Sequence, residues 1–317
     1  MASDRRRSQL ARRSGSYFHS DSGRPRMWAG VGDPVPVGVS ATVRSGQRRH
    51  RGVDRQQRPG GNAFEMISEL RRLDAGLSLY ALGLLGEDQD GHAILSACHK
   101  LEVDTFQLQV TDVAPTAHTI VIEDEARHSQ TRLYFPGANQ LLGEEHFDFR
   151  RCLASWFHLS DHHLLERLSR KEEGGAAANK TLLMARAAGL QTSLVATTCD
   201  HPADLLSMLT ALDCLVINDR VWEALAGRAL RSAHSFLEQA RSLAASLFQG
   251  GIQDSFAVLF PEGAFAILSS GESAWLPMPQ TSNAKPLTNA AFSAVFLYGR
   301  YSGWTLERCL AETLALR

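Results

Sequence analysis

The chain has 317 residues, of which 44% are hydrophobic and 21% charged, and this suffices for one large or two modest domains with a packed core. It has no run of 18 apolar residues, so we expect no membrane-spanning helix and no membrane partner. The five cysteines include no Cys-x-x-Cys pair, which argues against a disulfide framework or a zinc site and favours reduced thiols in a cytoplasmic protein.

The net charge of −1 conceals a basic N-terminal segment on an acidic body. Residues 1–60 carry thirteen Arg and no Lys against four Asp, a net charge of +9, so the other 257 residues net −10. These Arg lack the interleaved aromatic residues and the helical period of a nucleic-acid-binding face, so we expect no nucleic-acid partner. We interpret residues 1–26 as a disordered or non-native leader, with an organelle transit peptide as the alternative, and residues 27–317 as one domain.

The first half of the domain alternates between strand and helix patterns. Residues 28–43 are apolar, whereas residues 44–58 are too charged for a packed strand. Apolar residues at helical spacing then predict a helix over 63–73. The patterns that follow predict a strand over 77–85, a helix over 92–101, and strands over 105–110, 118–123 and 131–135.

The second half continues the alternation. A strand at 154–159 lies between two helical stretches within residues 145–170, and the later segments follow the same rhythm. We expect a strand–helix alternation over 182–188, 192–196, 203–212 and 214–217, then a helix at 236–247, a strand at 256–259 and a helix at 291–302. This order predicts a layered α/β fold with a mostly parallel sheet.

Two short motifs stand where the chain turns between these elements. Gly60-Gly61-Asn62 opens the first helix, where glycines let the backbone approach a ligand and the helix start offers free N–H groups. Gly137-Ala138-Asn139 follows the strand at 131–135. Taken alone, each motif is at least as often an ordinary turn as a binding site.

Together with Asn289-Ala290-Ala291-Phe292, these motifs have an order and spacing that resemble the ribokinase (PfkB) family of sugar and nucleoside kinases over about residues 60–310. The resemblance implies a three-layer α/β/α fold with a small β lid, and the charge of residues 44–58 leaves open whether this lid is complete. It also implies ATP-dependent phosphoryl transfer to a sugar hydroxyl with Mg²⁺, and a homodimer formed through the lid.

The resemblance assigns most of its matching residues to the two halves of a kinase site. It places six residues on the sugar or nucleoside side: Asp33, Gly60, Gly61, Asn62, Gly137 and Asn139. It places four on the nucleotide and phosphate side: Asn218, Asp219, Gly263 and Asn289. Several family positions are changed, since Val37 stands for a sugar-binding Asp, Glu65 for an Asn, Val221 for a Glu of the magnesium network and Phe260 for a Gly. A valine cannot bind a hard cation.

The catalytic motif departs most from the family. Family members have Asp-Thr-x-Gly-Ala-Gly-Asp-x-Phe there, and with Phe292 as the anchor, Leu287 and Asn289 replace the glycines while Ala290 replaces the catalytic base. Shifting the loop by one residue puts Asn289 at the base position, and Asn is no useful base. Loss of the base costs ~10²–10⁴ in rate and loss of an oxyanion donor ~10²–10³.

Two functions therefore remain, and the residue at position 290 discriminates between them. One is a carbohydrate kinase that is weakly active or inactive, with ATP and Mg²⁺ as cofactors if it is active. The other is a non-catalytic pseudokinase that binds a sugar or nucleotide, or serves as an interaction module. The family continues with a further helix lining the adenine pocket, so we expect a truncated C-terminus.

We expect no metal site. His158, His162 and His163 surround Asp161, but no carboxylate or Cys partner has ligand spacing, so we interpret them as surface histidines at a strand end. Ser160 lacks the Gly-x-Ser-x-Gly elbow of hydrolases.

Overall fold

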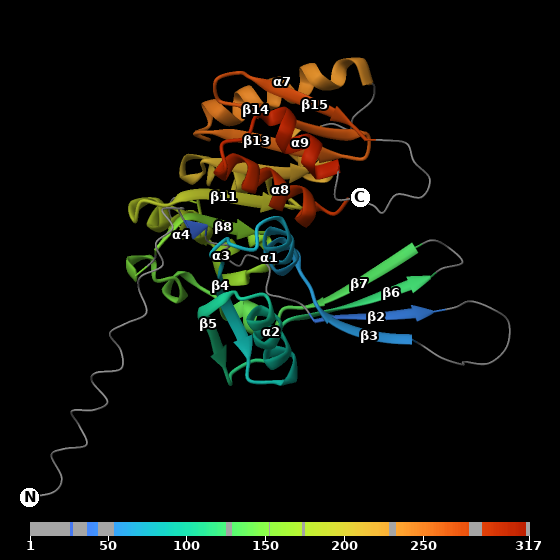
Figure 1. The fold of residues 1–317 in the computed structure, drawn as a ribbon, viewed down its shortest axis with the longest axis vertical. Coiled ribbons are helices and arrows are strands. Elements are labelled where there is room, and N and C mark those ends of the chain that lie inside the picture. Colours follow the sequence, from blue (N-terminus) through green and yellow to red (C-terminus); the bar gives the residue numbers. More distant parts are fainter. Residues whose placement is uncertain are drawn as a thin grey trace, which may run out of the picture.

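The computed structural model describes residues 26–27, 37–43, 54–124, 129–151, 153–172, 175–227, 233–278 and 287–314. Asp33 and all of the predicted leader except Arg26 lie outside the described residues, so the predicted leader and domain boundary stay predictions. The described chain forms a large α/β body and a small sheet that projects from it (Figure 1).

A seven-stranded sheet runs through the body in the order β1-β8-β11-β12-β13-β14-β15 within the described residues. The strands from β1 to β13 pair in parallel, and β14 and β15 add an antiparallel edge. This confirms the predicted mostly parallel sheet. The strands are β1 (Arg26–Met27), β8 (Ala154–Ser160), β11 (Gln191–Ala196), β12 (Cys214–Asn218), β13 (Ser255–Phe260), β14 (Gly263–Leu268) and β15 (Ser273–Pro277).

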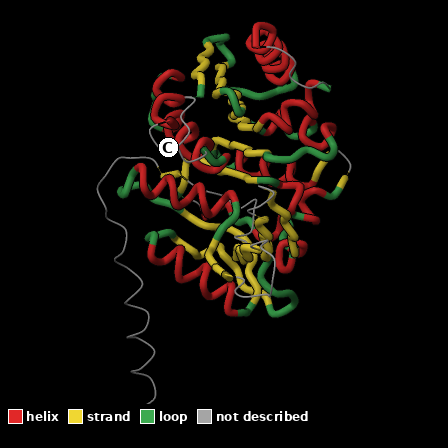
Figure 2. The backbone as a smooth tube through the Cα atoms, turned by 90° about the vertical axis from the view of Figure 1, so that its right-hand side faces the viewer, coloured by secondary structure: helices red, strands yellow, loops and turns green. Residues whose placement is uncertain are grey.

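The sheet is covered on both faces, as expected for parallel strands that read as continuous apolar runs. In β12, Leu215 and Ile217 join one buried cluster, whereas Cys214 and Val216 join the other. Helices flank the strands on both sides in Figure 2. The first cluster packs on α4 (Ala177–Ala187), α5 (Pro202–Leu206), α6 (Asp219–Ala226) and α7 (Ala233–Gln249), and the second on α1 (Asn62–Leu73), α2 (Gln89–Lys100), α8 (Asn289–Tyr301) and α9 (Leu306–Leu314).

The projecting sheet is a four-stranded lid in the order β3-β2-β6-β7. Its strands are β2 (Val37–Val43), β3 (Asp54–Pro59), β6 (His118–Asp124) and β7 (Ser129–Phe135). The expectation that residues 44–58 are too charged for a strand is wrong for residues 54–58, which pair with β2 as part of β3. The physical reason is its place at the sheet edge, where charged side chains can remain in water and discourage further strand pairing.

The other elements include several that the sequence did not predict. β4 (Tyr80–Gly86) and β5 (Asp104–Thr111), both predicted as strands, form a small parallel sheet. The expected helix before β8 consists of 3-10 turns, and the one after it is short. The remaining short elements of the described chain are η1 (Gly137–Leu141), η2 (Glu144–His146), η3 (Phe149–Arg151), η4 (His162–Leu164), α3 (Glu166–Ser169), β9 (Lys171–Glu172), β10 (Gly175–Ala176) and η5 (Leu209–Ala211). None of the helices in the described part of the chain is long and apolar enough to cross a membrane.

Candidate functional site

Asp161 lies where β8 ends, at the edge of the sheet to which parallel strands bring their carboxyl ends. Its Oδ1 accepts hydrogen bonds from the backbone N–H and the hydroxyl of Thr197, both at 2.7 Å. Its Oδ2 accepts one from Asn62 Nδ2 at 3.0 Å. The end of β8, the end of β11 and the start of α1 therefore meet at one carboxylate.

Two features of Asp161 oppose folding. Its side chain is a carboxylate in a residue only 2% exposed, and no described Lys or Arg forms an ion pair with it. Its backbone has φ 41°, a left-handed conformation that costs a non-glycine residue on the order of 1–3 kcal/mol. Strain and buried charge held in place by three donors are typical of binding and catalytic sites.

The second predicted motif connects to the same turn. Leu164 N–H donates to the Asp161 carbonyl at 2.9 Å, and the Leu164 carbonyl accepts from the Tyr134 hydroxyl at 3.3 Å. Asn139 Nδ2 in turn donates to the Tyr134 oxygen at 2.6 Å. The two motifs predicted for substrate binding thus belong to one network, but Asn139 is fully buried and braces Tyr134.

The glycines of these motifs have identifiable structural roles. Gly137 has φ 46°, and a Cβ there would lie 2.2 Å from the Pro115 carbonyl oxygen, so no larger residue fits. Gly61 precedes α1 with φ 89°, and no side chain caps the first turn of the helix. Gly60 is buried and Asn62 is half-buried. The motif is connected to Asp161 by the side-chain amide of Asn62.

Asn218, predicted for the nucleotide side, uses its side chain within the protein. Its Oδ1 accepts from Val221 N–H at 3.0 Å and caps α6, while its Nδ2 donates to the Thr197 carbonyl at 2.8 Å. Asn218 therefore positions Thr197 beside Asp161. Asp219 is the first residue of α6 and is half-buried.

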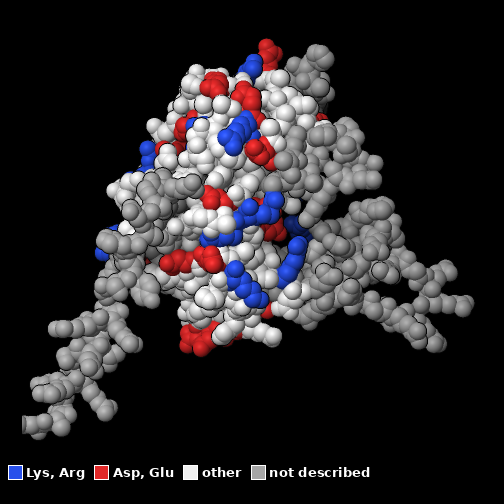
Figure 3. All heavy atoms as spheres, viewed as in Figure 1, with Lys and Arg blue, Asp and Glu red and all other residues white. Residues whose placement is uncertain are grey.

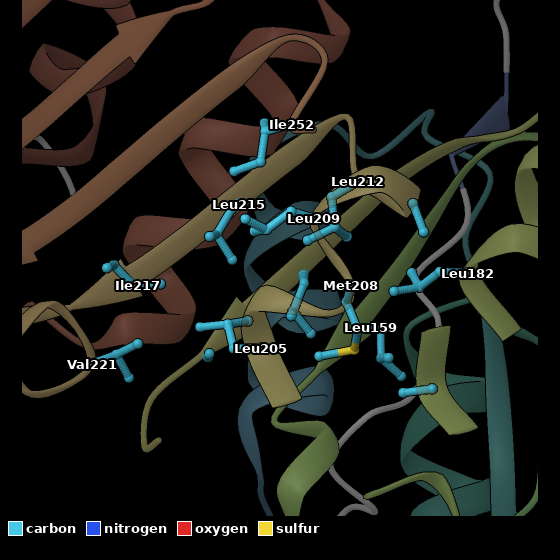
Figure 4. Close-up of a cluster of buried hydrophobic side chains, with 14 of the residues drawn as sticks. Leu159, Leu182, Leu205, Met208, Leu209, Leu212, Leu215, Ile217, Val221 and Ile252 are labelled. Atoms are coloured by element: carbon cyan, nitrogen blue, oxygen red, sulfur yellow. The ribbon is translucent and has the colours of Figure 1, made fainter. Parts of the chain in front are cut away.

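The remaining nucleotide-side positions are occupied by packed apolar groups. Val221 is fully buried and lies beside Leu205 and Ile217 (Figure 4). Phe260 is 1% exposed and contacts Trp222 edge-on at 5.9 Å between ring centroids.

Gly263 pairs with Phe260 across a tight hairpin, not in a wide loop. A Cβ on Gly263 would lie 2.4 Å from the Leu276 carbonyl oxygen. This glycine therefore permits close strand packing.

The N-terminus of α8 points toward the same edge as that of α1. The two helices lie side by side, and the Tyr298 hydroxyl near the end of α8 donates to Asp74 at the end of α1 at 3.0 Å. Thr288 caps α8 with its own hydroxyl, which accepts from Ala291 N–H at 3.1 Å. Ala290 is 2% exposed, Asn289 is half-buried, and the first turn contains no acidic residue.

The prediction that the three histidines are surface residues is wrong. His158 and His162 are 3% and 5% exposed, and His163 is half-buried. His158 bonds the hydroxyls of Ser193 and Ser160 at 2.8 Å each, and burial lowers its pKa to about 3. These bonds let β8 carry a neutral imidazole within the core. In the described part of the chain, no three His, Cys, Asp or Glu side chains are grouped so as to hold a metal ion.

The sequence pattern predicted Asn62 for a binding site but did not predict that Asp161 and Thr197 bond with one another beside it. Both residues directly follow buried strands that neighbour each other in the sheet, which was the available signal.

Lys and Arg lie beside Asp and Glu on the face seen in Figure 3, and no separate basic face is visible there.

The sequence model of the pfkB family carbohydrate kinases matches residues 37–315. No curated protein sequence matches the chain. Among solved structures, the chain is similar to a ribokinase from Thermotoga maritima, with a TM-score of 0.70 and 16% identity over 92% of this chain and 91% of that one. An Arabidopsis thaliana ribokinase complexed with ribose and ATP gives 0.70 and 17% over the same shares, and an Escherichia coli putative ribokinase II in complex with ATP and Mg²⁺ gives 0.70 and 15%, again over 92% and 91%.

Proposed function

The chain belongs to the PfkB family of carbohydrate kinases, and from this premise we propose that it binds a sugar or nucleoside at Asp161 and transfers phosphate to it slowly or not at all. The observation that carries the proposal is the buried, strained Asp161 carboxylate, which is held by Asn62 and Thr197. An ordinary sugar kinase is the second candidate, favoured by family membership alone.

Ligand binding is supported by the chemistry of this carboxylate. A carboxylate has about four acceptor positions, and three donors occupy Asp161. A remaining position can accept a ligand hydroxyl in a charge-assisted hydrogen bond of about 1.5–3 kcal/mol. Because Asn62 and Thr197 already fix the carboxylate, the ligand has little side-chain entropy to remove.

The family's ATP and Mg²⁺ do not fit the residues on the nucleotide side. Val221 is buried among apolar side chains and offers no oxygen to a cation. The side chain of Asn218 already forms hydrogen bonds with Val221 N–H and the Thr197 carbonyl. Phe260 and Gly263 belong to a packed hairpin. We therefore assign no phosphoryl-transfer step to these residues.

Slow or absent turnover is also supported at α8. Ala290 supplies no base, and Thr288 occupies one of the N–H groups that an anion would need.

We further propose a cytoplasmic homodimer formed through the lid. Support for the dimer comes from Leu133 and Phe135 of β7, which are 45% and 43% exposed on the same face of their strand. Cys98, Cys199, Cys214 and Cys309 are free thiols, which suits a reducing compartment. Light scattering of the intact protein and of a Leu133→Lys variant tests the dimer, because only a lid interface makes the variant monomeric.

The ligand proposal is tested by calorimetry and thermal shift across a panel of neutral sugars, nucleosides and ATP. We expect at least one sugar or nucleoside to bind, Asn62→Ala to abolish that binding, and the exposed Glu272→Gln to preserve it. A coupled assay on the same panel should detect little ATP turnover. Binding that survives in Asn62→Ala places the ligand elsewhere, and turnover at ~1–100 s⁻¹ makes the chain an ordinary kinase.

A further inference from the structure

A second hydrogen bond joins the same two segments that Asp161 and Thr197 connect. Thr198 Oγ1 and His163 Nε2 lie 2.5 Å apart. Thr197 and Thr198 both follow β11, and Asp161 and His163 both follow β8. The two hydrogen bonds therefore lie next to each other and connect the ends of these strands. These two hydrogen bonds fix the η4 turn in place, and with it the left-handed backbone conformation of Asp161.

His163 has a buried nitrogen that this arrangement leaves without a partner. No described residue forms a hydrogen bond with its Nδ1. The His162 ring lies edge-on at 6.2 Å between centroids, and its Nδ1 is also buried and unpartnered in the described part of the chain. The site therefore suits a neutral imidazole, because a protonated ring must donate from both nitrogens.

The charged groups around His163 come from four segments. Asp161 precedes it on its own segment, and Asp200 faces it from the loop after β11. Asp204 of α5 and His163 both act electrostatically on His162. The packed helix α3 carries Glu166 and Arg167, and Arg167 is already paired with Glu145.

We propose that His163 is a positioning residue that, through Thr198, orients the Asp161 carboxylate and makes ligand affinity at this site depend on pH. The ligand part of this proposal rests on the proposed function, whereas the coupling of His163 to Asp161 does not. Protonation of His163 gives its buried Nδ1–H a need for an acceptor, and Asp161 and Asp200 are the carboxylates that face it. A protonated ring drawn toward these carboxylates pulls on Thr198 through the hydrogen bond between Nε2 and Oγ1, and the displacement of the neighbouring Thr197 weakens its bonds to Asp161.

The direction of the pH effect follows from burial. Burial lowers the pKa of His163 below 6.5, while Asp161 and Asp200 act in the opposite direction. The ring is therefore neutral at pH 7 and above, where Asp161 is correctly held. Ligand affinity should be full there and should fall as the pH drops through the pKa of His163.

The coupling can be measured on the intact protein without a ligand. NMR titration between pH 4.5 and 8 follows the His163 ring and the Thr197 amide, which donates to Asp161. We expect the Thr197 amide shift to titrate with the His163 midpoint. In Thr198→Val this link should be lost, in Thr198→Ser it should be kept, and in the exposed His99→Gln it should be unchanged. The proposal is overturned if the Thr197 amide shift does not change with the titration of His163. It is also overturned if the shift changes equally in Thr198→Val.

A second arm measures the affinity for the ligand found in the panel. We expect about a fivefold or greater loss of affinity between pH 7.5 and 5.5 in the native protein, and a loss of less than about twofold in His163→Gln. An equal loss in both proteins refutes the role of His163 in binding. If the native protein binds nothing in the panel, the proposed function fails, and the amide titration alone decides the coupling.

Discussion

Replacing Asp161 by Ala tests whether this carboxylate organises the edge of the sheet. The change leaves three donors without their acceptor: Thr197 N–H, the Thr197 hydroxyl and Asn62 Nδ2. The backbone N–H cannot turn away, so its loss costs ~1–3 kcal/mol, while each side-chain donor can seek water and loses ~0.5–1.5 kcal/mol. We expect a total near 3 kcal/mol.

The assay is thermal unfolding of matched variants in one buffer. A loss of about 3 kcal/mol lowers the Tm by about 4–5 °C in a chain of this size, because the unfolding entropy grows with chain length. Asp161→Gly removes the same acceptor without placing a Cβ in a left-handed conformation, so it should be about 1 kcal/mol less harmful than Asp161→Ala. The exposed Asp200→Ala at the same edge should change stability by less than about 0.5 kcal/mol.

Equal and small shifts for Asp161→Ala and Asp200→Ala refute the reasoning, because they show that the buried network contributes nothing. A less stable Asp161→Gly than Asp161→Ala removes the claim of backbone strain. Either result also weakens the proposed ligand site, which depends on a fixed Asp161.

Three further predictions address other parts of the molecule. Ala290→Asp alone should restore little sugar-dependent ATP turnover in a coupled assay, and adding glycine at Leu287 and Asn289 should restore more; full recovery by Ala290→Asp alone contradicts this. Phe260→Ala should cost about 3–5 kcal/mol in urea unfolding because the ring is 1% exposed, whereas Phe106→Ala, 78% exposed, should cost little; similar losses contradict the packed hairpin. Burial lowers the pKa of His158 to about 3 and that of His162 to about 4, against 6.5 in the unfolded chain. The unfolded state therefore binds more protons below pH 6.5, and the free energy of unfolding falls as the pH drops toward 4. An unchanged urea midpoint between pH 7 and pH 5 rules this out.

The sequence predicted much of the architecture because apolar periodicity is a local property. Helical spacing in residues 63–73 and the buried strand at 154–159 both have their counterparts in the structure, as α1 and β8. The ordered motifs also predicted the family, which the match over residues 37–315 confirms. Residues 54–58 were not predicted as a strand because charge alone does not show whether a strand is central or at an edge, and β3 lies at the edge.

The site depended on contacts that no local pattern contains. Asn62, Asp161 and Thr197 are far apart in the chain and meet only because α1, β8 and β11 bring their ends to one edge of the sheet. The left-handed turn at Asp161 and the inward packing of Phe260 likewise follow from surrounding contacts, not from the residue types. The sequence by itself determined the strand–helix order, and its motifs led to the prediction that Ala290 stands where the family has its base. Only the tertiary structure decided which polar groups share a hydrogen bond, because that requires atoms from distant segments to lie within about 3 Å of one another.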